Sequence, residues 1–134
     1  MKQQLTEEDR RALVAYRLER AHETMKEIPY HIENGYYATA VNRLYYACYY
    51  AVGALLIQNG LHAQTHNGVI QLFGLHFVKT GKVSKEQGKL YNQLFSLRLT
   101  GDYNDSYTLC EEDVLPLIEP AREMIIFIEQ ILKK

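Results

Sequence analysis

The sequence contains no tryptophan, two cysteines, three prolines and no long apolar run. A helix that crosses a bilayer needs about 18 to 20 successive apolar residues, and no stretch approaches this length. Residues 1–11 are polar and charged, so they lack the apolar region of a secretory signal. These absences predict a cytoplasmic protein without a membrane partner.

Metal, disulfide and common catalytic motifs are also missing. Cys48 and Cys110 stand alone without CxxC spacing, which predicts two free thiols in a reducing compartment. His62 and His66 have the spacing of a metal-binding pair on a helix. However, residues 60–64 are typical of a loop and no carboxylate is near, which favours a role at a helix start or on the surface. There is no GxSxG, HExxH or glycine-rich phosphate loop, and we expect no metal and no cofactor.

What is present is one domain of helical pattern. The length of 134 residues, with 47% apolar and 23% charged residues, is typical of a single globular domain over residues 1–134. Caps, periodicity and glycines predict helices over residues 6–34, 36–59, 65–80 and 84–101, a polar loop over 102–108 and a last helix around 117–132. No segment alternates with period two. We predict an all-α, up-and-down antiparallel bundle of four or five helices.

The prolines modify this pattern. Pro29 is expected to kink the first helix or to end its regular part near Ile28, because proline disfavours the helical conformation of the residue before it. Pro116 fits the start of the last helix better than its middle, and Pro120 is expected to bend that helix.

Four tyrosines, at positions 45, 46, 49 and 50, give the second helix its distinctive character. Their spacing predicts two stacked pairs on one side of the helix. Such rings either enter the core with their hydroxyls satisfied locally or line a dimer face. Small residues on adjoining faces indicate that neighbouring helices approach closely; these are Ala40, Ala47, Ala51 and Ala54.

Charge is unevenly distributed along the chain. Residues 35–101 carry six Lys and Arg against one Asp or Glu, whereas residues 102–134 carry three against eight. The two segments either pair within the fold or leave a basic surface for phosphates. Four of the central lysines surround one predicted turn, which we name the lysine turn: Lys79, Lys82, Lys85 and Lys89. This turn is either ordinary solvated surface or a phosphate-attracting patch.

Arg98 precedes Asp102 and Tyr103 at the predicted end of the fourth helix. The arginine either forms a local pair with the carboxylate or presents its fork to a phosphate. A role in binding requires Arg98 to project into an accessible groove beside Asp102 and Tyr103.

The order of several segments resembles the HEPN family (higher eukaryotes and prokaryotes nucleotide-binding), in its small single-domain prokaryotic members. The resemblance covers residues 17–130. The matching segments are Gly35–Tyr37, Ala40–Ala47, Ala54–Leu56 with Gly60, Thr65–Ile70, Phe73, Phe77–Gly81, and Arg98 with Gly101–Tyr103. The resemblance implies an antiparallel helical bundle that is commonly a homodimer. It also implies a toxin, or a partner of a small nucleotidyltransferase in a two-gene module.

The ribonuclease branch of this family has an Arg followed four to six residues later by a His at a composite dimer site. Here Arg98 is present, but no histidine follows His76. We therefore interpret the chain as a non-catalytic or regulatory module of a toxin–antitoxin-like pair that binds a nucleotide or RNA. The resemblance implies a ligand site at Arg98, Asp102, Tyr103, Arg43, Tyr46 and His66. The alternatives are a metal-independent ribonuclease toxin that uses Arg98 with Asp102 or His66, and a purely structural protein-binding partner.

Overall fold

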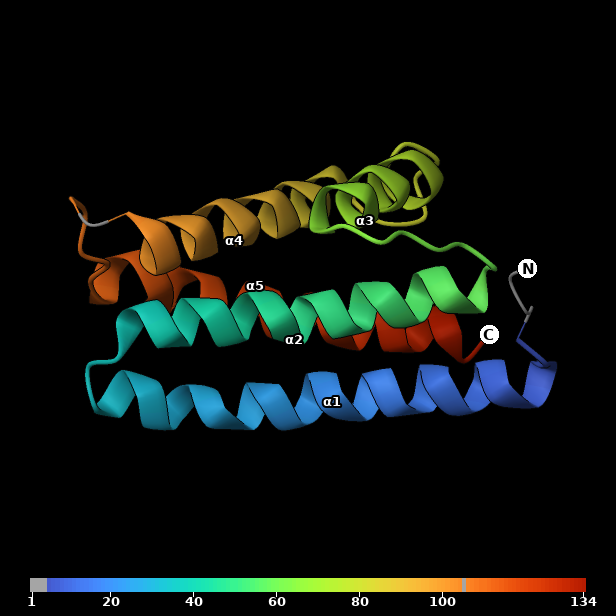
Figure 1. The fold of residues 1–134 in the computed structure, drawn as a ribbon, viewed down its shortest axis with the longest axis horizontal. Helices are drawn as coiled ribbons and strands as arrows, with labels where there is room; N and C mark the ends of the chain where they lie inside the picture. The colour runs from blue at the N-terminus through green and yellow to red at the C-terminus, as the bar shows by residue number, and fades with distance from the viewer. Residues whose placement is uncertain (1–4, 105) are drawn as a thin grey trace.

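The structure is a computed structural model that describes residues 5–104 and 106–134. These residues form five α-helices and one π-helical segment, without a strand. The elements are α1 (Glu7–Glu33), α2 (Tyr37–Gln58), α3 (His66–Phe73), η1 (Gly74–Val78), α4 (Lys85–Tyr103) and α5 (Glu111–Leu132). Successive long helices run in opposite directions along the bundle (Figure 1). The predicted all-α, up-and-down architecture is confirmed.

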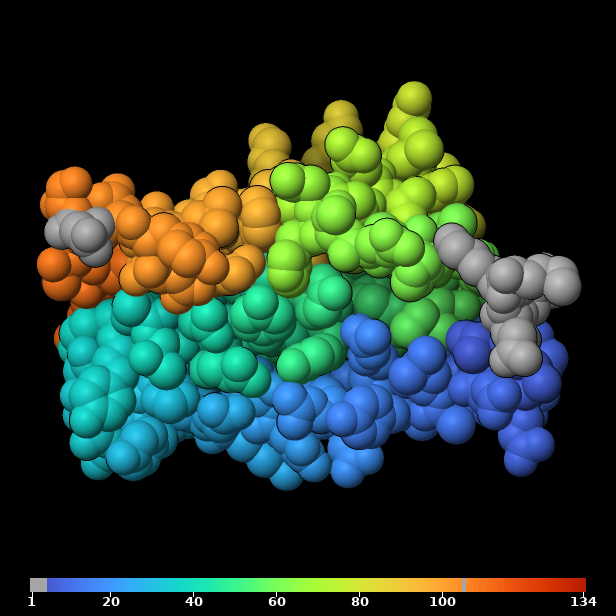
Figure 2. All heavy atoms as spheres, in the orientation of Figure 1, coloured from blue at the N-terminus to red at the C-terminus, as the bar shows by residue number. Residues whose placement is uncertain are grey.

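α2 is the central helix of the bundle. It lies between α1 and α4, with α5 behind it in Figure 1. Leu44, Tyr45, Cys48 and Leu55 are completely buried. The alanines of α2 at positions 40, 47, 51 and 54 are also fully buried, so the predicted close approach of neighbouring helices is confirmed. In the space-filling view, side chains fill the spaces between the ribbons on this face (Figure 2).

α1 begins as predicted but continues past its proline. The Thr6 side chain accepts a hydrogen bond from the Asp9 backbone N–H (3.0 Å), which caps the helix. Pro29 lies inside α1, and the helix runs on to Glu33. The prediction that the regular part ends near Ile28 is wrong, because a proline removes one backbone donor while later residues still bond to the preceding turns.

The turn before α4 has the predicted caps but an unpredicted π-helix. The Ser84 hydroxyl and the Gln87 side chain form a reciprocal capping box at the start of α4. The helix that starts after Thr65 changes to π-helical geometry at Gly74, where the Lys79 N–H donates to the Gly74 carbonyl (2.8 Å). Gly81 then has a φ of 80° and ends the segment.

α4 ends later than predicted, at Tyr103 instead of Gly101. Gly101 does not take the left-handed conformation of a helix stop. A Cβ atom at this position would lie 2.8 Å from Leu109 Cδ1 and 3.3 Å from Ala38 Cβ, so the glycine allows close packing instead. Asp102 and Tyr103, which we expected in a loop, are therefore helical. Of the predicted loop over 102–108, position 105 lies outside the described residues.

α5 begins at Glu111 and contains both later prolines. The prediction that Pro116 lies near the helix start holds only loosely, because five residues of α5 precede it. Within the described residues, no helix combines the length and the apolar character that a membrane crossing requires.

Candidate functional site

Arg98 lies on α4 beneath aromatic rings from α2 and from its own helix. Its guanidinium carbon is 5.4 Å from the ring centre of Tyr45, 5.3 Å from Tyr46 and 6.0 Å from Phe95. The residue is only 9% exposed. The expectation that Arg98 projects into an open groove is therefore wrong: the guanidinium lies beneath neighbouring side chains, and only 10% of the side chain is exposed. Aromatic faces attract a cation, which offsets part of its desolvation.

Asp102 fixes the orientation of this guanidinium. Because α4 continues past Gly101, Asp102 lies one helical turn after Arg98, and its Oδ2 accepts from Arg98 Nε at 3.2 Å. The same oxygen accepts from Asn42 Nδ2 on α2 at 3.1 Å. Among the described residues, the two terminal nitrogens of Arg98 have no hydrogen-bond partner. The local Arg–carboxylate pair is confirmed, and it leaves the fork of the arginine unused.

His66 comes to this place from the first residue of α3. Its ring lies 4.9 Å from the ring centre of Tyr49 and 5.8 Å from that of Tyr46. A 2.7 Å hydrogen bond joins its Nδ1 to the Tyr45 hydroxyl. Partial burial, and then the positive charge of Arg98, lower the pKa of His66 below its ordinary value of 6.5. The ring is therefore neutral at pH 7, while burial raises the pKa of Tyr45 to about 12.

These side chains form one group, which we name the Arg98 cluster. Its members are Asn42, Tyr45, Tyr46, His66, Phe95, Arg98 and Asp102. The cluster places the Arg98 guanidinium, the Asp102 carboxylate and a neutral imidazole beside one another on α3 and α4. Such a group can hold a phosphate and can accept a proton near neutral pH.

The family follows from the sequence around this cluster. The family model of the HEPN domain matches residues 14–131, which include every member of the cluster. The chain belongs to the HEPN family. The resemblance seen in the sequence is thereby confirmed.

Two relatives match this HEPN chain along nearly their whole length. A UPF0332 protein of Thermotoga maritima is 39% identical over 93% of this chain and 95% of that protein. A protein of Methanocaldococcus jannaschii, named as a candidate toxin, is 32% identical over 97% of this chain and 96% of its own length. The crystal structure of TT1696 from Thermus thermophilus has a TM-score of 0.73 at 17% identity, covering 87% of this chain and 96% of that one. This last similarity shows the shared fold.

Two predicted site residues of the HEPN chain lie at the margin of the cluster. Arg43 is 5.7 Å from the Tyr46 ring, but its Nε also lies 3.7 Å from Glu27 on α1. Tyr103 is 70% exposed and follows Asp102 on the surface. The structure thus brings together Arg98, Asp102, Tyr46 and His66, while Arg43 partly braces α1 and Tyr103 stands outside.

The four tyrosines of α2 differ in how deeply they are buried. Tyr45 is fully buried and its hydroxyl is hydrogen-bonded to His66, so the core interpretation with a locally satisfied hydroxyl holds for Tyr45. Tyr46, Tyr49 and Tyr50 are half-buried, and the Tyr50 hydroxyl accepts a hydrogen bond from Arg20 (3.2 Å). The predicted stacking is not observed, because the rings of Tyr45 and Tyr49 are tilted by 30° and those of Tyr46 and Tyr50 by 41°.

Asn42, Tyr45 and Phe95 belong to the cluster but were not predicted as site residues. Phe95 precedes Arg98 by three positions, a helical spacing that places the two side chains on one face. Asn42 and Tyr45 are separated from Arg98 by more than fifty positions in the sequence. Their roles depend on the packing of α2 against α4, which no local pattern encodes.

Proposed function

We propose that this HEPN module is non-catalytic or regulatory, and that its Arg98 cluster binds the phosphate of a nucleotide or of RNA. The proposal rests on the hydrogen bonding of the Arg98 guanidinium. Its Nε is fixed by Asp102, while the terminal nitrogens have no partner among the described residues. A planar fork with free terminal N–H groups is suited to a phosphate, which it can contact through two hydrogen bonds.

A purely bracing role explains this arrangement less well. A buried ion pair seldom stabilises a fold more than apolar side chains of similar volume would. The cluster nevertheless contains Arg98, Asp102 and a neutral His66 in one place. Beside it, the ring of Tyr103 is exposed and offers a flat face on which a base can stack. Because Arg98 does not project into an open groove, the phosphate would reach it through the 10% of its side chain that is exposed, with Arg43 as a second positive charge.

Thermal unfolding in the presence of AMP, ATP and a short single-stranded RNA tests the proposal. A ligand of the native state at about 100 times its Kd adds about 2.7 kcal/mol to the free energy of unfolding, which is several degrees in Tm. We expect at least one of these ligands to raise the Tm. Arg98→Lys should abolish most of the shift, because lysine keeps the charge but loses the fork.

Arg122→Lys is the matched control, because Arg122 pairs with Glu119 at an exposed position in the middle of α5. A wild-type Tm that no nucleotide or RNA changes would overturn the proposal. It would favour the alternative of a structural module that only binds another protein. If Arg98→Lys and Arg122→Lys reduced the ligand-induced rise in Tm equally, the ligand would bind outside the cluster.

A second function, a metal-independent ribonuclease, is favoured by one observation. The family pattern lacks its histidine after Arg98, yet the fold brings His66 into the cluster with a lowered pKa. A neutral imidazole can accept the proton of a ribose 2′-hydroxyl at pH 7. Asp102 suits this role less, because it already accepts from Arg98 and Asn42.

Cleavage of a labelled RNA in the presence of EDTA separates the two functions. A ribonuclease would cut the RNA, and His66→Gln would remove the cutting while RNA binding remained. In cells, induced expression would arrest growth, and Arg98→Ala would relieve the arrest. Binding without cleavage, and expression without arrest, would leave the non-catalytic function.

We further propose that the module acts as a homodimer and as the partner of a nucleotidyltransferase in a toxin–antitoxin-like pair. Exposed apolar side chains on α5, including Leu115, Ile126 and Phe127, support an interface there. Light scattering should give a mass of about twice the 15.6 kDa of one chain. Co-purification with the product of an adjacent nucleotidyltransferase gene tests the second partner. A monomer that binds no such enzyme contradicts both statements.

A further inference from the structure

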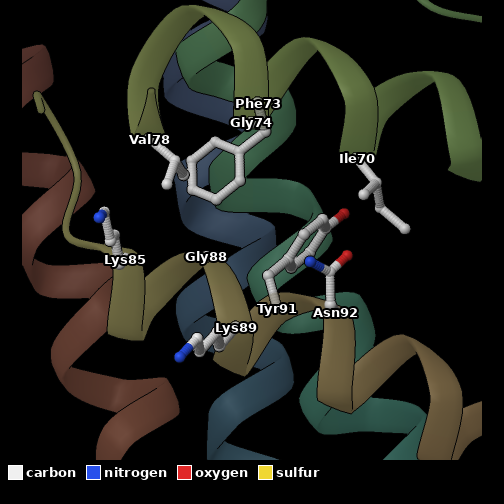
Figure 3. Close-up of a pocket in the computed structure, with 9 residues that line it drawn as sticks. All are labelled: Ile70, Phe73, Gly74, Val78, Lys85, Gly88, Lys89, Tyr91 and Asn92. Carbon is white, nitrogen blue, oxygen red and sulfur yellow. The ribbon is translucent and has the colours of Figure 1, made fainter. Parts of the chain in front are cut away.

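A cleft lies between the π-helical segment and the start of α4, and no member of the Arg98 cluster lines it. Figure 3 shows its wall, in which Phe73 and Val78 face α4 from above, and Tyr91 rises from α4 beside them. Its volume is about 240 Å³. The complete lining is Ile70, Phe73, Gly74, Val78, Lys85, Gly88, Lys89, Tyr91 and Asn92. Most of this surface is apolar.

Two glycines and the change of helical geometry shape the cleft. A Cβ atom at Gly88 would lie 3.0 Å from Val78 Cγ2, so η1 packs closely on α4 at that point. A Cβ atom at Gly74, which also lines the cleft, would meet no atom within 4 Å. A π-helical turn is rare and is often found at functional sites. Here the π-helical segment begins at Gly74, which lines the cleft.

One side of the cleft is positively charged. In Figure 3 the side chains of Lys85 and Lys89 extend to the same side, opposite Ile70 and Asn92. Neither lysine forms an ion pair within the described residues. The start of α4 adds the positive end of a helix dipole. An apolar slot with two free cations on one side fits a ligand that is apolar at one end and anionic at the other.

We propose that this cleft binds a small amphipathic acid, with a single aromatic ring or a short aliphatic chain in the slot and its carboxylate beside Lys85 and Lys89. The size supports this class, because a cavity of about 150 Å³ holds benzene and drug-sized ligands need about 300 Å³ or more. Tyr91 connects the two sites, since its ring stacks on Tyr45 at 5.7 Å and 21°. The proposal does not depend on phosphate binding at the Arg98 cluster.

Titration with sodium 4-phenylbutyrate, followed by amide NMR, tests the site. The chain has eight glycines, and their amide signals lie in a separate region of the spectrum, so two wall residues report directly. We expect Gly74 and Gly88 to shift in a saturable manner, while Gly35 and Gly60 at other turns stay unchanged. Neutral 4-phenylbutanamide lacks the carboxylate, and acetate lacks the aromatic ring. Each should therefore bind at least about tenfold more weakly than 4-phenylbutyrate.

Two sets of variants locate the binding. Gly74→Leu places a side chain in the slot and should abolish the shift of Gly88, with the helical content unchanged. Lys85→Gln with Lys89→Gln should weaken binding, whereas Lys79→Gln with Lys82→Gln, on the same turn but outside the cleft, should not. The proposal is overturned if Gly88 does not shift, if the amide binds as tightly as the acid, or if both lysine pairs matter equally.

Discussion

At the scale of single residues, Arg98 combines near-complete burial with one fixed hydrogen bond. Its charge is balanced by Asp102, whose side chain is 26% exposed, and by the aromatic faces above it. A carboxylate that two donors share, Arg98 and Asn42, is held more firmly than one in an exposed pair. Removal of one partner from the pair of Arg98 with Asp102 should therefore destabilise the fold more than the same change in an exposed pair of similar sequence spacing.

We predict that Asp102→Ala lowers the free energy of unfolding by about 2 kcal/mol, because it leaves a nearly buried guanidinium without its partner. Glu119→Ala should cost less than about 0.5 kcal/mol, since it breaks an exposed pair with Arg122. Urea unfolding of both variants measures the difference. Equal losses of unfolding free energy in the two variants would mean that water or the aromatic rings stabilise the Arg98 charge without Asp102.

The histidine of the cluster predicts a pH dependence. In the unfolded chain His66 titrates near 6.5, but in the folded state burial and Arg98 lower its pKa. Below the unfolded value the unfolded chain thus binds more protons, and folding loses stability as the pH falls. Between about pH 7.5 and 5.5, His66→Gln should show a smaller loss of Tm than the wild type. His62→Gln, at an exposed position, should behave as the wild type.

The sequence predicted part of the Arg98 cluster. The pair of Arg98 with Asp102 was predicted as one of two alternatives, with Asp102 just past the end of the helix. Its helical spacing of four was missed, because α4 continues to Tyr103. Tyr46 and His66 were expected near them from the family resemblance, and the fold brings them there. Asn42 and Tyr45 were missed, since their contacts arise only when α2 packs on α4. The burial of Arg98 was also missed, because it depends on three rings from two helices.

At the scale of elements, glycines have two opposite effects on α3, η1 and α4. Gly101 allows the end of α4 to approach Ala38 and Leu109, whereas Gly74 borders empty space. Both positions are helical, so replacing either glycine with alanine has the same intrinsic effect on helix stability, a gain of up to about 1 kcal/mol in the free energy of unfolding. Only the surroundings differ.

We predict opposite signs for the two alanine substitutions. Gly74→Ala should leave stability unchanged or raise it by up to about 1 kcal/mol. Gly101→Ala should lower it by about 1 to 3 kcal/mol, because the new methyl group overlaps Leu109 and presses on Ala38. Thermal unfolding of the two variants measures whether each change raises or lowers stability. A stabilised Gly101→Ala variant would contradict the packing role of this glycine.

The boundaries of most elements were predictable because caps are local. Thr6, Thr65 and Ser84 each bond to a backbone N–H three residues later, as their sequence context indicated. The end of α4 was not predictable, since a glycine can stop a helix or make room for a neighbour. The π-helical turn at Gly74 was not predictable either, because apolar spacing alone does not separate it from an α-helix.

At the scale of the whole molecule, the lysine turn and the acidic start of α5 lie at opposite ends of the bundle (Figure 1). Within the described residues, the Arg98–Asp102 pair is the one ion pair that joins residues 35–101 to residues 102–134. The lysines of the turn therefore remain available to anions. The interpretation that the charged segments pair within the fold holds for Arg98 and not for the lysine turn.

The thiol of Cys48 lies in the dry centre of the bundle, and burial raises its pKa to about 12. A disulfide reagent reacts with a thiolate, so Cys48 should stay unreactive until the helices separate. Cys110 is exposed and can be replaced by serine, which keeps the cap of α5. In that variant the slow labelling of one sulfur atom would measure how often the bundle opens. The labelling rate of Cys48 thus reports the opening of the helical bundle.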